Sequence, residues 1–419
     1  MAHEQFIRRL FELQGTNFTV VDMQQYSEKK RVELKVWHKA EGKYFCGRCG
    51  ELHTKYYDKR EIVLKDVPIG EWQVLWKVQR VRVECSCHHV PVVELLPFRS
   101  EHHQLTRRMQ EYAEGLLCTK MFTVKDVSRV LNLDYGVVYK IDHAILLELI
   151  QYAEIPEITH IGVDEKSFLK GHKYVTLVSC LKRGKVIWAS PGKSEESLDK
   201  FFQVIGPERA AKIEFATRDE SPAYIASLHK NAPNALQVSD KFHVVKTLNE
   251  TIDQVRRELS KQNEIPKGSL WILRKREKNL SDKQQIKLKE LKSENELLYE
   301  LYLLKEKFFE FFNYPPKQVD KAEGFLNNWL RLIAYYGLEP LNKFIEHIVR
   351  HKWSILNIVR TGFTNATSEG LNRKINVLKA MAYGYKNVQY FMLKILQRCG
   401  ILGQLYTNFT RHKPLNLPT

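Results

Sequence analysis

The chain has 419 residues, of which 43% are hydrophobic, and its 66 Lys and Arg against 49 Asp and Glu give a formal net charge of +17. This size and apolar content predict a globular protein of two to four domains, and the positive charge favours a polyanion such as nucleic acid over a small neutral ligand. No apolar run approaches the roughly 18 residues of a membrane-spanning helix and the N-terminal segment lacks a signal-peptide core, so we expect a cytoplasmic, nucleoid-associated protein without a membrane partner.

Four of the seven cysteines form two close pairs, Cys46 with Cys49 and Cys85 with Cys87. Two such pairs in a reducing compartment are typical of a metal site rather than of disulfides. The alternating stretch at 71–85 predicts strands that bring the second pair back to the first, as in a zinc ribbon. Four protein ligands leave no open coordination position, so we expect one structural Zn²⁺.

The second cysteine pair is a C-x-C, which is tighter than the C-x-x-C of the first pair. His88 or His89 therefore remains open as a replacement for one of the thiolate ligands. We assign residues 1–100 to this N-terminal zinc-ribbon domain.

Residues 101–155 are predicted to be helical, with one helix at 107–118 and two more within 123–146, separated by a break at 132–134. The last two fit a DNA-binding helix-turn-helix. Four side chains are expected to pack inward: Val124, Val127, Val130 and Leu131. Three residues are expected to face the DNA groove, after an N-cap at Asp134: Tyr135, Tyr139 and Lys140. A three-helix bundle with only a packing role has similar spacing, and that alternative stays open.

Three β-runs at 160–165, 173–181 and 185–192 are separated by short connections, which predicts an antiparallel meander. A helix at 194–206 and a fourth strand follow. This order is the opening of an RNase H-like fold.

Asp164 is expected to end the first of these strands, and Asp219 the fourth. If the two strands are parallel neighbours, both carboxylates meet at one edge of the sheet. Two acids that close repel each other unless a cation lies between them, and oxygen ligands favour Mg²⁺ or Mn²⁺. Glu165 and Glu220 do not fit as further ligands, because strand alternation points them away from this edge.

Four motifs occur in order along the chain: GVDEKSFLKGHKY, ATRDESPAY, SDKFHVVK and TNATSEGLNRKINVLKAMAYGY. Together they resemble the DDE transposases of the bacterial insertion-sequence family called ISL-three, whose members also carry an N-terminal zinc ribbon and a helix-turn-helix. The resemblance runs from about Cys46 to Arg398. It implies a transposase that binds terminal inverted repeats, cleaves and joins DNA strands, and assembles as a homodimer or higher oligomer on transposon ends and target DNA.

The resemblance implies that Asp164, Asp219 and Glu369 are the catalytic residues and hold two Mg²⁺ or Mn²⁺ ions. It also matches a D-x-x-H element of the family to Asp240 and His243. For this pair we expect a supporting role through hydrogen bonding, because Asp240 is expected to end a fifth strand at the same edge of the sheet.

Glu369 fits the third place by its position in the sequence. It lies near the start of a predicted helix with Thr367 or Ser368 as N-cap, so its carboxylate would stand on the first helical turn. The alternative is a surface Glu paired with Arg373, four residues on. Arg373 and Lys374 are also predicted to contact DNA.

Before Glu369 the chain inserts an almost wholly helical segment, 251–360, which divides the catalytic domain into 156–250 and 361–419. Its aromatic stripe predicts helix packing, and SDKQ at Ser281 predicts a capping box. A basic cluster in this segment either lies along phosphate backbone or is a solvated charge run: Arg274, Lys275 and Arg276.

The expected fold class is therefore α+β and multidomain: a zinc ribbon, a helix-turn-helix, and an RNase H-like mixed-sheet domain interrupted by an all-helical insertion. Two other functions stay open beside the transposase. A structure-specific nuclease of the same fold, such as a junction resolvase, needs the same acids but no separate sequence-reading front end. A DNA-binding regulator descended from a transposase would keep the front end and lose the acids.

Overall fold

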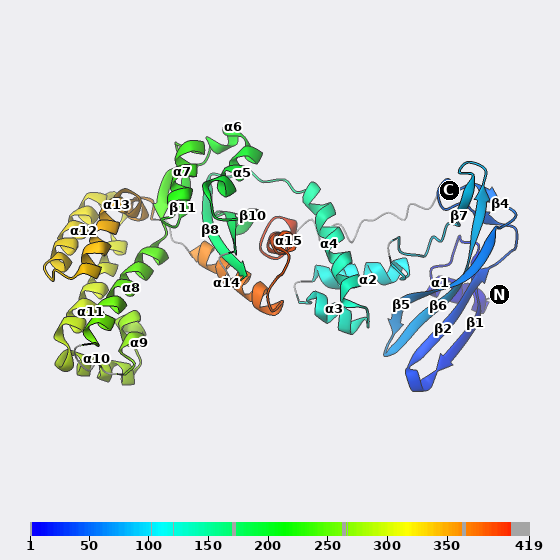
Figure 1. Ribbon diagram of the computed structural model, residues 1–419, viewed down its shortest axis with the longest axis horizontal. Helices are drawn as coiled ribbons and strands as arrows, with labels where there is room; N and C mark the ends of the chain where they lie inside the picture. Colours follow the sequence, from blue (N-terminus) through cyan, green and yellow to red (C-terminus); the bar gives the residue numbers. More distant parts are fainter. Residues whose placement is uncertain are drawn as a thin grey trace. The chain divides into compact units, whose positions relative to one another are not determined.

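The computed structural model describes residues 2–101, 103–119, 121–169, 173–261, 265, 267–362 and 366–403. They form two compact units, the first within residues 2–152 and the second at Ala153–Gly403 (Figure 1). The predicted C-terminal tail after residue 403 and part of the predicted loop after the first catalytic-domain strand lie outside the described residues. None of the helices in the described ranges is long and apolar enough to cross a membrane.

The first unit contains a five-stranded sheet in the order β1-β2-β6-β5, with β7 paired to β6. Its strands are β1 (Phe18–Tyr26), β2 (Arg31–His38), β5 (Asp58–Ile69), β6 (Trp72–Cys85) and β7 (Val90–Val93). Three smaller elements join them: α1 (Ala2–Leu10), η1 (Ser27–Lys29) and the hairpin of β3 (Tyr44–Phe45) with β4 (Leu52–His53). The strand predicted at 71–85 is confirmed as β6, whose alternate residues Val74, Trp76 and Val78 are buried in the core.

A buried carboxylate connects this sheet to the helix that follows it. Asp66 on β5 accepts hydrogen bonds from Trp76 Nε1 at 2.8 Å and Thr106 Oγ1 at 2.6 Å, and it pairs with Arg108. Thr106 is also the N-cap of α2 (Arg107–Cys118), where it accepts from the amide of Met109. One acid thus holds the start of α2 against the sheet.

Three helices follow as predicted: α2, α3 (Val124–Val130) and α4 (Tyr135–Gln151). Asp134 caps α4 by accepting from the amides of Gly136 and Val137, which confirms the predicted N-cap. Three of the four side chains expected to pack inward are buried: Val124, Val127 and Leu131. The prediction for Val130 is wrong, because this side chain is 55% exposed. It ends α3 on a different side of the helix from the buried stripe.

The second unit is built on a mixed sheet in the order β10-β9-β8-β11-β12. The strands are β8 (His160–Leu169), β9 (Lys173–Cys180), β10 (Lys185–Pro191), β11 (Phe215–Arg218) and β12 (Leu236–Ser239). The first three form the predicted antiparallel meander, and β11 runs parallel to both β8 and β12.

Helices cover both faces of this sheet. Three lie between the strands in sequence: α5 (Glu195–Ile205), α6 (Pro207–Ala210) and α7 (Pro222–Asn231). Residues of α5 and α7 share a core with Ile161, Val163 and Val178 of the sheet. The alternate residues Gly162, Leu177 and Ser179 face α14 (Ala366–Met381), while α15 (Val388–Cys399) packs against β10.

The segment between β12 and α14 is helical, as predicted. Its elements are α8 (Lys241–Leu259), α9 (Ser269–Arg274), η2 (Glu277–Asn279), α10 (Asp282–Glu294), α11 (Glu296–Phe308), η3 (Phe309–Asn313), η4 (Pro316–Gln318), α12 (Val319–Ala334) and α13 (Glu339–Thr361). The predicted capping box of Ser281 with Gln284 is present. The segment does not stand apart from the sheet, because Asn357 Nδ2 of α13 donates to the carbonyl of Gln237 on β12 at 2.8 Å.

Candidate active site and metal-binding cluster

The strand register brings three aspartates to one level of the sheet. Phe215 of β11 lies opposite His160 of β8 on one side and Leu236 of β12 on the other. Four residues after these paired positions come Asp219 (after Phe215), Asp164 (after His160) and Asp240 (after Leu236). Side chains at the same level of neighbouring parallel strands lie side by side. The pairing of β11 with β8 and β12 therefore accounts for the expected meeting of Asp164 and Asp219.

The prediction that Asp164 ends its strand is wrong. β8 continues to Leu169, because Asp164 and the residues after it stay paired with β9, with Asp164 opposite Leu177. On the other side β11 stops at Arg218. Asp164 thus lies within a strand whose neighbour has ended, so one side of it is open to the site.

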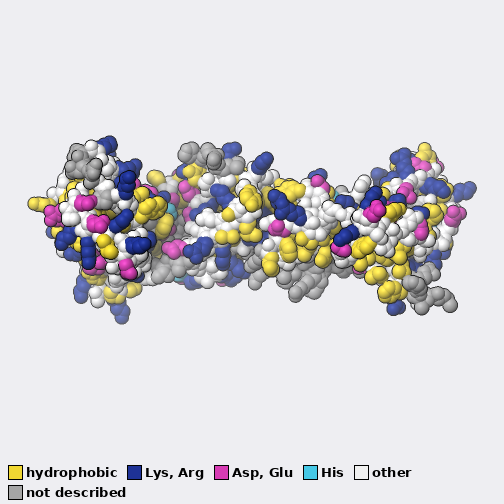
Figure 2. Space-filling view, turned by 90° about the horizontal axis from the view of Figure 1, so that it is seen from below, with side chains coloured by type: hydrophobic (Ala, Val, Ile, Leu, Met, Phe, Trp, Pro, Cys, Tyr) yellow, Lys and Arg dark blue, Asp and Glu magenta, His cyan; other side chains and the backbone are white. Residues whose placement is uncertain are grey.

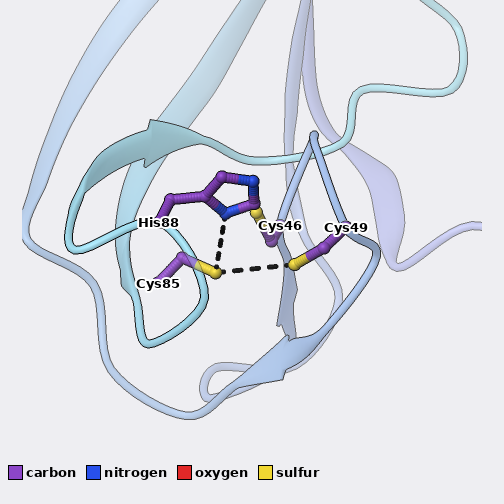
Figure 3. Close-up of side chains that lie close together, drawn as sticks. All are labelled: Cys46, Cys49, Cys85 and His88. Carbon is purple, nitrogen blue, oxygen red and sulfur yellow. Dashed lines mark hydrogen bonds between the residues drawn. The ribbon is translucent and has the colours of Figure 1, made fainter.

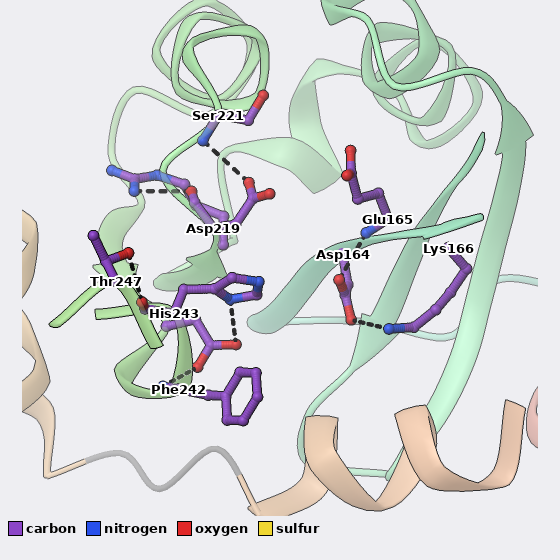
Figure 4. Close-up of polar contacts among 10 residues, drawn as sticks. Asp164, Glu165, Lys166, Asp219, Ser221, Phe242, His243 and Thr247 are labelled. Carbon is purple, nitrogen blue, oxygen red and sulfur yellow. Dashed lines mark hydrogen bonds and ion pairs between the residues drawn. The ribbon is translucent and has the colours of Figure 1, made fainter. Parts of the chain in front are cut away.

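Burial and like charge act together on Asp219. Burial, followed by the charge of Asp164, raises the pKa of Asp219, against the opposing effect of a hydrogen bond from the amide of Ser221. Figure 4 shows Asp219 and Asp164 on the two sides of one space, with the His243 ring beside it. Lys166 Nζ lies 3.2 Å from Asp164 Oδ2 and supplies one compensating charge.

Asp240 and His243 form the pair that the D-x-x-H spacing predicts. Asp240 is the N-cap of α8, where one carboxylate oxygen accepts from the amide of Phe242 at 2.8 Å and the other lies 3.1 Å from His243 Nδ1. This hydrogen bond, followed by the charges of Asp240, Asp219 and Asp164, raises the pKa of His243 although burial opposes it. The neighbouring acids therefore favour the protonated form of this imidazole.

The two neighbouring glutamates do not share the direction of the aspartates that precede them. In Figure 4 the carboxylates of Glu165 and Asp164 point in opposite directions. Glu220 Oε2 lies 2.7 Å from His347 Nε2 of α13. Burial raises the pKa of Glu165, with the charge of Lys193 opposing and the aspartates adding to the rise.

Glu369 stands exposed on the first turn of α14. The helix begins at Ala366, so Thr367 and Ser368 lie inside it and the prediction of either as N-cap is wrong. A hollow between α14 and the sheet is lined by residues of both: Gly162, Val163, Asp164, Leu177, Ser179, Val186, Thr217, Arg218, Asp240, His243, Ser368, Leu371, Asn372 and Ile375. Glu369 lies beside this lining, and its charge raises the pKa of Lys241, which burial and Arg276 lower more strongly.

Two polar residues of α14 lie in this lining: Asn372, which sequence reasoning did not single out, and Ser368, which it considered only as an N-cap. Their i, i+4 spacing with Leu371 between them marks a single helix face and would have identified them. Arg373 and Lys374 are exposed on the same helix.

The two cysteine pairs meet in the first unit, as predicted. The ligand atoms of four residues lie within 4.8 Å of one another: Cys46, Cys49, Cys85 and His88 (Figure 3). Cys85 Sγ lies 3.5 Å from Cys49 Sγ and 3.2 Å from His88 Nδ1. Gly47 permits the tight turn, because a Cβ there would lie 2.5 Å from the carbonyl oxygen of Val93.

Cys87 belongs to a second, more exposed group. Its thiol lies 3.4 Å from Glu51 Oε2, and a set of four residues again has its ligand atoms within 4.8 Å: Cys49, Glu51, Cys85 and Cys87. His89 is in neither set and has a positive φ of 52°. Of the two histidines that the sequence leaves open, His88 is the one beside the thiols.

The residues predicted to read DNA lie on α4. Tyr135 is 54% exposed and Lys140 is also exposed, while Tyr139 is half-buried. The rings of Tyr135 and Tyr139 are stacked, with centroids 6.4 Å apart. The first turns of α4 therefore present an aromatic and basic surface.

The basic cluster of the helical segment has partners within the chain. Arg274 lies 3.7 Å from Asp253, and Lys275 Nζ donates to Gln284 Oε1 at 3.1 Å. Arg276 faces Glu306. Figure 2 shows further Lys and Arg side chains spread over the face in view, so basic charge is not confined to this cluster.

The family model for transposases named DDE_Tnp_ISL3 matches residues 161–395, more than half of the chain. The chain belongs to this family and is a DDE-type transposase of insertion-sequence type. It is 29% identical over 398 residues to the transposase for insertion sequence element IS1001 of Bordetella parapertussis, covering 93% of this chain and 97% of that relative. It is 26% identical over 376 residues to the transposase for insertion sequence element IS1557 of Mycobacterium tuberculosis (strain CDC 1551 / Oshkosh), covering 82% and 83% respectively.

Proposed function

We propose that Asp164, Asp219 and Glu369 are the catalytic carboxylates with which this transposase cleaves and joins DNA strands. The observation that carries the proposal is the common level of Asp164, Asp219 and Asp240 at the open side of β8. The strand order β10-β9-β8-β11-β12 supports an RNase H-like catalytic domain. Glu369 would complete the set from the first turn of α14.

The donor set fits two divalent cations such as Mg²⁺ or Mn²⁺. Asp219 is half-buried near the carboxylate of Asp164, and both effects raise its pKa. A divalent cation bound between the two carboxylates would offset this repulsion. When bound, a metal pair supplies activation of the attacking oxygen and stabilisation of the leaving oxygen in an in-line displacement. The protein's own part is to hold the acids at one level, with Asp240 orienting His243 beside them and α14 covering the opposite side.

The first unit would provide recognition and structural support. We assign one structural Zn²⁺ to Cys46, Cys49, Cys85 and His88, since three thiolates and one imidazole match its preferred donors. α3 and α4 would read the terminal inverted repeats as a helix-turn-helix. A homodimer or higher oligomer on two transposon ends and the target would complete the active complex.

A cleavage assay with MgCl₂ on DNA carrying the element's own ends tests the catalytic assignment. Asp164→Asn, Asp219→Asn and Glu369→Gln should each abolish cleavage and joining while DNA binding remains. Glu196→Gln, an exposed change on α5, is the matched control and should keep wild-type activity. A fully active Glu369→Gln protein would mean that Asp240, and not Glu369, is the third catalytic carboxylate.

A further inference from the structure

Two cations from distant segments lie over neighbouring aromatic rings, and one of them directly follows Asp240 in the chain. Lys241 is the first residue of α8 and directly follows Asp240. Its Nζ lies 4.3 Å from the ring centroid of Phe312, and the guanidinium carbon of Arg276 lies 4.0 Å from the ring centroid of Phe309. The two rings belong to the same turn, η3, with centroids 6.4 Å apart.

We propose that Lys241 and Arg276 form a phosphate clamp that binds the DNA backbone immediately next to the catalytic carboxylates. The proposal rests on the proposed function, because it takes the DNA strand at the active site as its ligand. It adds the residues that would grip that strand from the side of the helical segment.

The aromatic turn explains how the cations keep their positions. A cation over a ring face is attracted by the ring's negative quadrupole, which holds it in place without neutralising its charge. Carboxylates would neutralise the charge and compete with a phosphate. The two half-buried rings of η3 therefore hold the cations in position in the absence of a ligand. This preorganisation lowers the entropic cost of binding an anion.

The local charge supports an anionic ligand. Burial lowers the pKa of Lys241, and the charges of Arg276 and Lys278 lower it further, while Glu369 opposes them. Like charges have thus been brought together at a cost that a polyanion would relieve. Arg276 also faces Glu306, but Arg276 Nε lies 3.5 Å away from that carboxylate and makes no hydrogen bond with a described residue.

The position favours the DNA backbone over a free anion. Lys241 is covalently adjacent to Asp240, at the level where Asp164 and Asp219 meet, and consecutive Cα atoms are about 3.8 Å apart. A strand with one phosphate at the aspartates would have its neighbouring phosphates close to this point. An ammonium and a planar guanidinium together offer several donors to the non-bridging oxygens of a neighbouring phosphate.

The test measures DNA affinity of the full-length protein by fluorescence anisotropy over a range of salt concentrations. Each lost phosphate contact should lower the slope of log K against log salt by about 0.9. We expect this change for Lys241→Gln and for Arg276→Gln. Lys343→Gln is the matched control, because Lys343 is exposed and forms an ion pair within α13 with Glu339 at 2.8 Å, and it should leave the slope unchanged.

Phe312→Leu provides a second variant that keeps apolar volume and removes the ring under Lys241. It should weaken binding in the same direction, and its melting temperature is measured alongside, because the Phe312 ring also contacts Phe308 and Phe311. Unchanged slopes in both cation variants, at a wild-type melting temperature, would overturn the clamp. Wild-type protein that binds the ends but does not cut them with Mg²⁺ would refute the proposed function, and the salt slopes would still decide for or against the clamp.

Discussion

His347 Nε2 lies 2.7 Å from Glu220 Oε2, and Glu220 directly follows Asp219. The carboxylate side chain is only 9% exposed. His351, one turn further along α13, packs against His347 with ring centroids 5.0 Å apart and ring planes tilted by 58°. A helix of the inserted segment therefore contacts the residue next to Asp219, one of the proposed catalytic acids.

Removing the histidine should destabilise the fold through the buried acid. Glu220 Oε1 makes no hydrogen bond with any described residue, so His347→Ala would leave both carboxylate oxygens without one. We expect a loss of about 2 kcal/mol in the free energy of unfolding, measured by urea denaturation at pH 7. His347→Gln keeps a donor and should lose less; equal losses for the two variants would contradict this role.

The same pair predicts a pH dependence. Burial alone would raise the pKa of Glu220, but the hydrogen bond from His347 and the charges of His347, His351 and Arg218 lower it below its ordinary 4.5. A carboxyl group whose pKa is lower in the folded state stabilises the fold at pH values above its pKa in the unfolded chain. This stabilisation is lost as the pH falls through its pKa in the folded state. The stability difference between wild type and Glu220→Gln should therefore shrink below about pH 4.5, and a difference that grows there would exclude the linkage.

Asp219→Asn should stabilise the metal-free protein. A raised pKa means that the charged form is penalised in the folded state, so the penalty is full at neutral pH and disappears below the unfolded value of 3.8. The amide oxygen of Asn can still accept from Ser221. We expect the melting temperature of the second unit at pH 7, without divalent metal, to rise by roughly 2 °C.

A neighbouring change with the opposite sign provides the control. Asp199 has a lowered pKa, because hydrogen bonds from Lys230, Ser227 and Asn231 outweigh its burial. Asp199→Asn should therefore lower the same melting temperature. If both variants shifted it in the same direction, charge repulsion at Asp219 would not be the cause.

Local patterns were sufficient to predict much of this fold. Strand alternation and connection lengths predicted the meander and β6, and N-cap chemistry predicted the start of α4 at Asp134. These features depend on residues close in sequence. Alternation also agrees with the opposite directions of the Glu165 and Asp164 carboxylates and with the contact of Glu220 to His347.

Features that depend on distant partners were missed or wrong. Asp164 lies inside a strand because β9 continues to pair with it, which its own neighbours in sequence do not reveal. The partner of Glu220 is His347, 127 residues away. Val130 is apolar, as core residues are, but it lies at the end of α3 outside the row of buried side chains. The choice between Cys87 and His88 likewise depends on how the turn at Cys46 approaches the second pair.

Changes on α4 should separate base reading from phosphate binding. Tyr135→Ser removes an exposed ring at the start of the helix and should weaken binding to the element's ends roughly tenfold, with little effect on unrelated DNA. Lys140→Gln should weaken both and reduce the salt slope by about 0.9. Competition binding with end-containing and unrelated DNA measures the two effects. Equal loss on both DNAs for Tyr135→Ser would leave α4 only a packing role.

The helix itself must be intact for that comparison. Asp134→Ala removes the acceptor for the amides of Gly136 and Val137 and should cost about 1 kcal/mol of stability. Its DNA affinity should fall less than that of Tyr135→Ser if the cap only supports the helix. A larger fall would move direct recognition to the turn before α4.

The first unit offers two alternative sets of ligands for the proposed Zn²⁺. Two overlapping groups of potential ligands share Cys49 and Cys85, and they differ in having either Cys46 with His88 or Glu51 with Cys87. The first group is more buried, and its imidazole lies 3.2 Å from a thiol, whereas the Cys87 thiol is exposed. Buried thiolate and imidazole donors are the set that a structural zinc site prefers.

Elemental analysis of purified variants should therefore find one zinc per chain in Cys87→Ser and much less in His88→Ala. Because the metal contributes directly to folding, His88→Ala should also melt at a lower temperature, and a chelator should lower the melting temperature of wild type and Cys87→Ser to a similar level. His89→Ala is the matched control, since His89 belongs to neither group, and it should retain zinc and stability. Full zinc content in His88→Ala with loss in Cys87→Ser would assign the ion to the exposed group instead.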